Sequence, residues 1–121
     1  MMNIEELRTY CIAKPGVTEE LPFGPEVLVF KVMGKVFLLT NLTIPPFSVN
    51  LKMDPELVGE YRDKYVDVQP GYHMNKKHWN TVYMDRGTIP RKELLWMIEH
   101  SYEQVVKGFS KKVREEFNRI K

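Results

Sequence analysis

Two stretches rich in β-branched and aromatic residues, separated by a glycine, constrain the fold of this chain more than any other feature. Residues 27–33 and 36–40 consist mostly of valine, leucine and phenylalanine, which is the composition of strands. Only Gly34 and Lys35 lie between them. A two-residue loop that begins with glycine is typical of a type II′ turn. The sequence therefore predicts an antiparallel hairpin.

Three further segments carry strand signals. Residues 47–52 alternate between apolar and polar, which is the pattern of a strand with one buried and one wet face. Residues 66–68 and about 79–85 are extended segments on either side of a polar connection. Residues 17–26 contain two prolines and a glycine, so we expect a loop there, with Phe23 filling part of the core.

Four helix starts are marked by a capping residue or by proline at the first helical position. They lie at Asn3, Asp54, Pro90 and Ser110. The predicted order of elements is therefore α-β-β-β-α-β-β-α-α. Five short strands with short connections favour an antiparallel sheet with helices on one face, which is an α+β two-layer sandwich.

The length and composition are those of one domain. A chain of 121 residues that is 43% hydrophobic can bury a core without disulfides or a structural metal, so we expect a single domain over residues 1–121. The predicted core consists of the apolar residues on one face of each element. These are Phe30, Leu38, Val49, Leu51, Leu57, Tyr61, Val82, Leu94, Ile98, Tyr102 and Val105.

Cysteine usage and the start of the chain indicate a cytoplasmic protein. Cys11 is the single cysteine, so it cannot form an internal disulfide, and a reducing compartment fits. The first residues are acidic where a signal peptide is basic. No apolar run approaches the roughly 20 residues of a membrane span, so we expect no membrane contact.

The net charge of +2 hides an asymmetry between the two parts of the chain. Residues 1–67 carry 7 basic and 10 acidic residues, which gives −3, whereas residues 68–121 carry 11 and 6, which gives +5. Such a bias suits an anionic partner, and it also arises where solvated helices are rich in lysine.

Residues 68–82 hold a dense cluster of polar and aromatic side chains on a connection between two strands. His73 and His78 lie five residues apart, on opposite sides of an extended chain, and no cysteine is near. A histidine that acts in acid–base catalysis needs an orienting partner and a reacting group within reach, and the sequence indicates neither. We therefore expect no metal site, no cofactor and no enzymatic activity.

Several motifs resemble the MmcQ/YjbR family, and the resemblance covers nearly the whole chain. The motifs are Pro22-Phe23-Gly24-Pro25-Glu26, Leu51-Lys52-Met53-Asp54-Pro55-Glu56, Ser101-Tyr102 and above all Pro70-Gly71-Tyr72-His73-Met74-Asn75-Lys76-Lys77-His78-Trp79-Asn80-Thr81-Val82. The resemblance implies a small bacterial protein with a compact α+β fold, described as CyaY-like or double-wing. It also implies DNA binding, and it implies no catalytic residue.

The residues of the central connection suit phosphate contacts, because lysines there can neutralise phosphates and amides can donate to them. The expected DNA-binding set is His73, Asn75, Lys76, Lys77, His78, Trp79, Asn80 and Arg86. We expect a monomer. Two alternatives stay open. The turn can be a solvated loop that Asn75 holds through its own side chain, and the chain can be a protein-interaction or chaperone-like module without catalysis.

The orientation of Trp79 also stays open. If Val49 and Val82 face the helices, alternation places Trp79 and Tyr83 on the uncovered face of the sheet beside Lys52. Aromatic rings in that position are typical of surfaces that stack on bases. The other interpretation is that Trp79 points inward and anchors the turn.

Overall fold

The computed structural model describes residues 2–72 and 74–121. Within these residues the chain forms four helices and six strands. They are α1 (Ile4–Ile12), β1 (Val17–Glu20), β2 (Val27–Val32), β3 (Lys35–Asn41), β4 (Ser48–Lys52), α2 (Pro55–Lys64), β5 (Val68–Pro70), β6 (Trp79–Tyr83), α3 (Arg91–Lys107) and α4 (Lys111–Ile120). The strands form one antiparallel sheet in the order β1-β2-β3-β4-β6-β5. The predicted α+β class is confirmed, with one more strand than expected.

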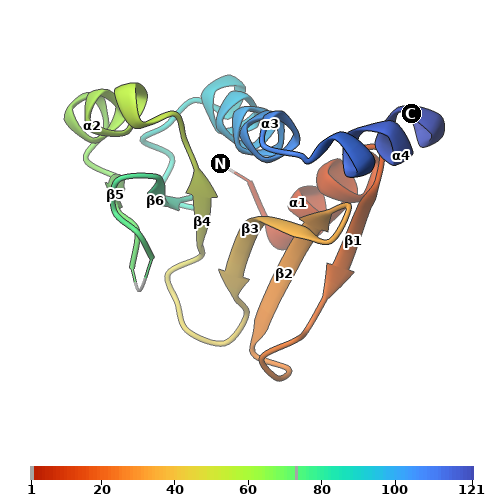
Figure 1. Ribbon diagram of the computed structural model, residues 1–121. Coiled ribbons are helices and arrows are strands. Elements are labelled where there is room, and N and C mark those ends of the chain that lie inside the picture. The colour runs from red at the N-terminus through yellow and green to blue at the C-terminus, as the bar shows by residue number, and fades with distance from the viewer. Residues whose placement is uncertain (1, 73) are drawn as a thin grey trace.

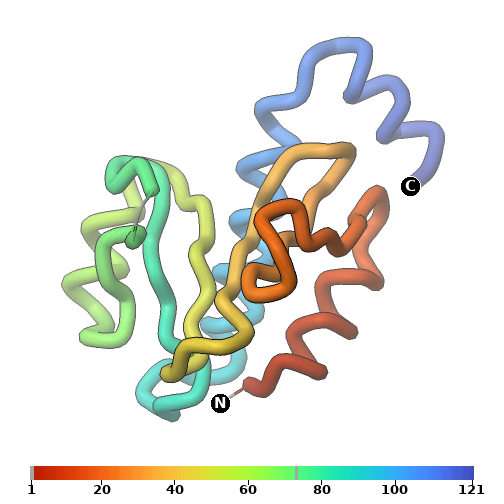
Figure 2. Tube along the Cα trace, turned by 90° about the horizontal axis from the view of Figure 1, so that it is seen from below, coloured from red at the N-terminus to blue at the C-terminus, as the bar shows by residue number. Residues whose placement is uncertain are grey.

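Figure 1 shows α2, α3 and α4 in a row along one side of the sheet. The longest helix, α3, contacts β2, β3 and β4, while α2 contacts β5 and β6, and α1 contacts β1. The first residues lie beside the connection between β6 and α3 (Figure 2), where the Met2 N–H donates to the Met84 carbonyl at 3.0 Å. No helix in the described part of the chain is long and apolar enough to cross a membrane.

The strand β1 was not predicted. It pairs with β2 from Val17 opposite Val32 to Glu20 opposite Val29. The loop is therefore limited to the residues between β1 and β2. Phe23 in this loop is 71% exposed, so the prediction that it fills the core is wrong. The loop extends past the ends of both strands, away from the helices (Figure 1).

The hairpin of β2 and β3 is confirmed, but its turn is shifted by one residue. Val32 pairs with Lys35, so the two turn residues are Met33 and Gly34. Their φ angles are 50° and 80°, and positive φ at both positions is the requirement of a type I′ turn. The predicted type II′ turn over Gly34 and Lys35 is wrong.

The core lies between the sheet and the helices. Phe30 and Phe37 lie on neighbouring strands with ring centroids 6.5 Å apart, and Tyr102 of α3 meets Phe37 edge to face at 5.5 Å. Nine predicted core residues are buried, namely Phe30, Leu38, Val49, Leu51, Val82, Leu94, Ile98, Tyr102 and Val105. The two others, Leu57 and Tyr61, are partly buried and pack against the core.

A serine of α3 lies between the two central strands at the point where they stop pairing. The strands β3 and β4 pair at three positions only, ending at Leu38 opposite Leu51. Beyond that pair the Ser101 hydroxyl accepts from the Lys52 N–H at 2.9 Å and donates to the Phe37 carbonyl at 2.5 Å. The two strands diverge toward α3 in Figure 1. We call β1–β3 with α1 the first half, and β4–β6 with α2 the second half.

A row of stacked rings joins α2 to α3. Tyr61 stacks on Trp96 at 5.5 Å, and Trp96 stacks on His100 at 4.7 Å. His100 Nε2 accepts from the N–H of Asp54, the capping residue of α2, at 3.1 Å. Burial lowers the pKa of His100, which favours the neutral ring that this bond requires.

Candidate nucleic-acid interface

The polar connection between β5 and β6 contains a compact turn, residues 75–78, which we call the basic turn. The Asn75 side chain accepts from the Lys77 N–H at 2.9 Å, and the Asn75 carbonyl accepts from the His78 and Trp79 N–H groups at 3.1 and 3.0 Å. The interpretation that Asn75 holds the turn is confirmed. The turn lies at the end of β4, because Trp79 pairs with Lys52.

Arg62 of α2 fixes the backbone of the basic turn. Its Nη2 donates to the Lys76 carbonyl at 2.5 Å and to the Trp79 carbonyl at 3.3 Å, and its Nε donates to Asn80 Oδ1 at 2.7 Å. Arg62 is missing from the predicted site. The signal for it is its spacing of four residues from the buried Val58, which places both side chains on one helix face.

Asn80 does not belong to the surface. Its side chain is 0% exposed, so the prediction that it contacts a nucleic acid is wrong. Its amide group donates to the Val58 carbonyl at 3.3 Å while its oxygen accepts from Arg62. The alternation of β6 already indicates this orientation, because Asn80 shares a face with the buried Val82.

The two lysines of the basic turn are held differently. Lys76 Nζ donates to the Gly71 carbonyl at 3.2 Å, and Lys77 is exposed. Neither lysine forms an ion pair with any residue that the structure describes. His78 is half-buried, and its carbonyl accepts from the Met53 N–H at 2.7 Å. The positive charge of this turn is therefore not compensated by a direct contact with a carboxylate of residues 2–72 or 74–121.

Arg86 does not join the basic turn. It follows the end of β6 where Tyr83 pairs with Ser48, while the turn precedes the other end of that strand. Its Nη1 lies 2.9 Å from Asp67 Oδ1, and its guanidinium lies 4.0 Å from the centre of the Tyr83 ring. Asp67 is buried, and its hydrogen bonds to the Thr88 hydroxyl and to Arg86 lower the pKa of its carboxyl. Arg86 thus compensates a buried charge.

The side of β4 and β6 that faces away from the helices carries Lys52, Trp79 and Tyr83, as strand alternation predicts. Because Val49 and Val82 pair and are buried, the opposite face carries Ser48, Asn50, Lys52, Trp79, Thr81 and Tyr83.

The connection after β5 crosses part of this face. The Tyr72 N–H donates to the Thr81 hydroxyl at 3.1 Å, the Thr81 hydroxyl donates to Asn50 Oδ1 at 2.6 Å, and Asn50 Nδ2 donates to the Tyr72 carbonyl at 3.4 Å. These bonds occupy the polar groups in the middle of the face.

Trp79 matches neither predicted orientation fully, because it lies on the face away from the helices and yet is half-buried. Gly71 packs against it so closely that a Cβ added to the glycine would lie 2.9 Å from Trp79 Cβ. His73, the remaining member of the expected set, lies outside the described residues. Residues 2–72 and 74–121 contain no group of three or more histidine, cysteine or acidic side chains placed to hold a metal ion.

The chain is similar to several known proteins over most of its length. The YjbR family model matches residues 12–104. YjbR of Escherichia coli K12 is 36% identical over 105 residues, which cover 87% of this chain and 88% of that protein. YbdF of Escherichia coli O157:H7 is 45% identical over 109 residues, which cover 89% and 88%. Both are called uncharacterized.

Two solved structures are similar in shape and in sequence. The crystal structure of Deinococcus radiodurans protein DR2400 has a TM-score of 0.89 at 41% identity, covering 98% of this chain and 89% of that one. A crystal structure of a protein from Pseudomonas syringae has a TM-score of 0.73 at 31% identity, covering 85% and 98%.

Proposed function

The chain belongs to the YjbR family, and we propose that it binds DNA, without catalysis, through the basic turn together with Lys52 and Trp79 beside it. The observation that carries this proposal is the contact between Arg62 and the turn. Arg62 fixes the backbone carbonyls of Lys76 and Trp79, while the two lysines of the turn have no ion-pair partner among the described residues.

A turn that is already ordered favours binding, because a partner does not bear the entropic cost of fixing its backbone. The Lys76 ammonium has three donors and uses one on Gly71, so donors remain for a phosphate oxygen. Lys77 extends from the same fixed backbone into solvent. Each phosphate that these lysines neutralise releases counterions, and this release supplies sequence-independent affinity.

Aromatic rings beside the lysines favour contact with unpaired bases. Trp79 lies opposite Lys52 on the same side of the sheet, and Tyr72 on the connection above that side is 71% exposed. Stacking of a base on such a ring contributes roughly 1 to 3 kcal/mol. The arrangement therefore supports a preference for single-stranded over double-stranded DNA.

A matched pair of variants tests the proposal. Lys76→Ala/Lys77→Ala removes two charges from the basic turn, and Lys111→Ala/Lys112→Ala removes two from the exposed start of α4. Fluorescence anisotropy with labelled single-stranded and duplex DNA at two salt concentrations is the measurement. The turn variant should bind DNA more weakly. The slope of log affinity against log salt on duplex DNA should become less steep by up to about 2 units in this variant. The affinity and the slope of the α4 variant should stay close to those of the unmodified protein.

Equal losses of DNA affinity in the two variants would mean that binding depends on net charge alone, and the proposed site would be wrong. An unmodified protein that fails to bind either DNA at low salt would overturn the function itself.

The second candidate function is a protein-interaction module. It is favoured by the loop between β1 and β2, where Leu21 and Phe23 are exposed on a backbone that contains two prolines. Exposed apolar groups of this kind are typical of partner contacts. A protein partner that is retained at moderate salt, and is lost in Phe23→Ser but not in the basic-turn variant, would support this function over DNA binding.

A further inference from the structure

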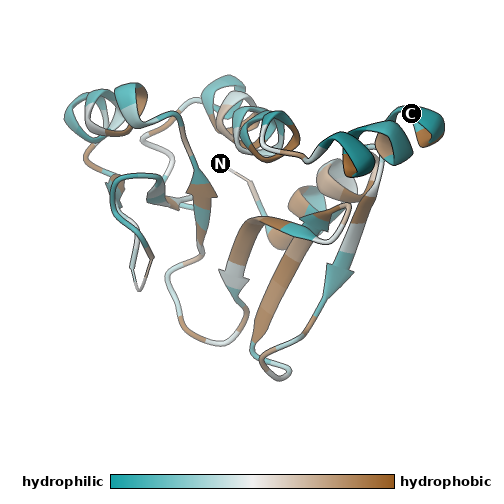
Figure 3. Ribbon diagram, viewed as in Figure 1, coloured by the Kyte–Doolittle hydropathy of each residue, from teal (hydrophilic) through white to brown (hydrophobic). Residues whose placement is uncertain are grey.

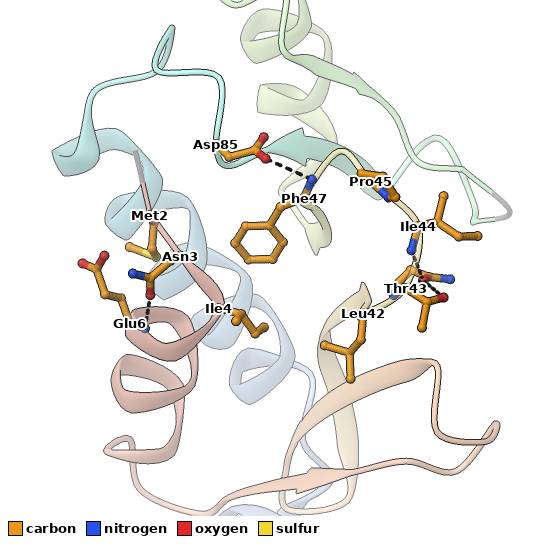
Figure 4. A pocket seen from close by; sticks show the side chains of 11 residues that line it. Met2, Asn3, Ile4, Glu6, Leu42, Thr43, Ile44, Pro45, Phe47 and Asp85 are labelled. Carbon is orange, nitrogen blue, oxygen red and sulfur yellow. Dashed lines mark hydrogen bonds between the residues drawn. The ribbon is translucent and has the colours of Figure 1, made fainter.

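A cavity of about 550 Å³ lies between the start of the chain and the connection from β3 to β4. Met2 and Ile4 line it from the first segment, and Leu42 and Phe47 point into it from the connection (Figure 4). Its volume and its mostly apolar lining are those of small-molecule sites. It is separate from the basic turn, since the connection leads into the opposite end of β4.

Hydrogen bonds hold the cavity open from both ends of the connection. The Asn41 side-chain oxygen accepts from the Thr43 and Ile44 N–H groups at 2.9 and 3.0 Å. At the other end, the Phe47 N–H donates to Asp85 Oδ2 at 3.3 Å (Figure 4). The connection therefore has a defined shape that does not depend on filling the cavity.

The cavity exposes apolar groups that a ligand could cover. Leu42 is 45% exposed although it belongs to the lining, and its side chain points into the cavity (Figure 4). Leaving such side chains in water forgoes the stabilisation that burial gives, so an apolar ligand body that covers them gains affinity.

The charges of the lining are negative only. Glu6 and Asp85 supply carboxylates, and the described lining contains no lysine, arginine or histidine. Glu6 forms an ion pair with Arg91. Asp85 forms no ion pair among residues 2–72 and 74–121, so its charge at the rim is not compensated by a direct contact.

We propose that this cavity binds a small organic cation, with an apolar ring-sized body between Ile4, Leu42 and Phe47 and an ammonium group beside Asp85. The carboxylate of Asp85, unpaired among the described residues, disfavours phosphate groups, so the ligand class differs from the DNA proposed for the basic turn. The two sites can be tested independently.

Three probes with similar apolar bodies test the charge requirement, namely 2-phenylethylamine, 2-phenylethanol and 3-phenylpropionate. Titrations followed by two-dimensional amide NMR of the full chain give both the affinity and the place of binding. The amine should shift the amides of the residues that line the cavity, the alcohol should bind roughly two- to five-fold more weakly, and the carboxylate more weakly still.

Asp85→Asn separates charge from shape, because an asparagine oxygen can still accept from the Phe47 N–H. This variant should lower the affinity for the amine to that for the alcohol and leave the alcohol unchanged. Leu42→Ala should weaken both by shortening the apolar wall, and its exposed position makes a folding defect a poor explanation. Equal affinities for the three probes, or shifts outside the cavity, would overturn the proposal.

Discussion

The two halves of the sheet are held together by different kinds of interaction. The first half is dominated by apolar packing, with Val29, Phe30, Phe37 and Leu38 all inaccessible to solvent. Figure 3 shows this as hydrophobic colour along most of β2 and β3. The second half contains the buried polar side chains of Asp67, Asn80 and Thr81 in addition to its apolar core, whereas in the first half Thr40 is buried and polar.

The buried polar residues of the second half form directional contacts. Asp67, Asn80 and Thr81 are each bonded to partners from other segments of the chain. Burying a polar group costs free energy unless its hydrogen bonds are made, so such a network is stable in one arrangement only. The basic turn belongs to the half whose geometry is set by hydrogen bonds, which suits a surface that must present charges at fixed positions.

The largest loss of stability is expected for a variant of a buried apolar residue in the first half. Phe37→Ala removes a fully buried ring that contacts Phe30 and Tyr102, and it should lower the free energy of unfolding by about 3 to 5 kcal/mol. Urea denaturation measures this change. The matched control is Phe23→Ala, where the ring is exposed and the expected change is below about 0.5 kcal/mol. Similar costs for the two variants would contradict the assignment of the core.

An intermediate effect is expected for a polar residue of the second half. Asn80→Ala leaves Arg62 Nε and the Val58 carbonyl without their partner, which should cost about 1 to 3 kcal/mol in urea denaturation. It should also weaken the proposed DNA binding, because Arg62 then holds the basic turn less firmly. Asn118→Ala removes an exposed amide of α4 and serves as the control. If Asn80→Ala lowered the free energy of unfolding as little as Asn118→Ala, the hydrogen bonds of Asn80 would not stabilise the second half.

The smallest effect concerns pH and the docking of α2. Burial lowers the pKa of His100 below its usual value of 6.5, so the folded state binds fewer protons than the unfolded state. The stability from neutral His100 is present above about pH 6.5 and is lost as the pH falls from that value through the lowered pKa of the folded protein. His100→Gln, which keeps an acceptor for the Asp54 N–H, should remove this part of the pH dependence of Tm.

The control for this experiment is His78→Gln, which changes a histidine outside the stacked row of Tyr61, Trp96 and His100. That variant should keep the decrease of Tm between pH 7 and pH 5. If the Tm of His100→Gln decreased in the same way between pH 7 and pH 5, the acid sensitivity would belong to another group.

Local patterns predicted most of the elements. Side-chain caps at Asn3, Asp54 and Ser110 are present as their residue types indicate. The edge strand β1 is not predicted from the sequence, because it is four residues long and contains two adjacent glutamates, which have low strand propensity. One of them, Glu19, pairs with Arg8 of α1, a contact between separate elements that no local window contains.

The candidate site was harder to predict than the fold. Lysines and a tryptophan are visible as residue types, but whether a polar side chain faces solvent depends on which element packs over it. The polar type of Asn80 predicts a surface position, while its partner Arg62 lies 18 positions earlier on another element. The orientation of Arg62 and Asn80 is indicated by their spacing from Val58 and Val82, which are buried on the same elements. Polar residue type indicates the opposite orientation for Asn80, and it is wrong there.

The contact between Arg62 and the basic turn bears on how this surface can change during evolution. Arg62 binds main-chain oxygens of Lys76 and Trp79, which every amino acid possesses. Substitutions at Lys76 and Lys77 can therefore alter the charge and shape that the turn presents and leave its path intact. A chain of this fold with an arginine and an asparagine at positions 62 and 80 can therefore present acidic, aromatic or small residues at 76 and 77 on the same scaffold.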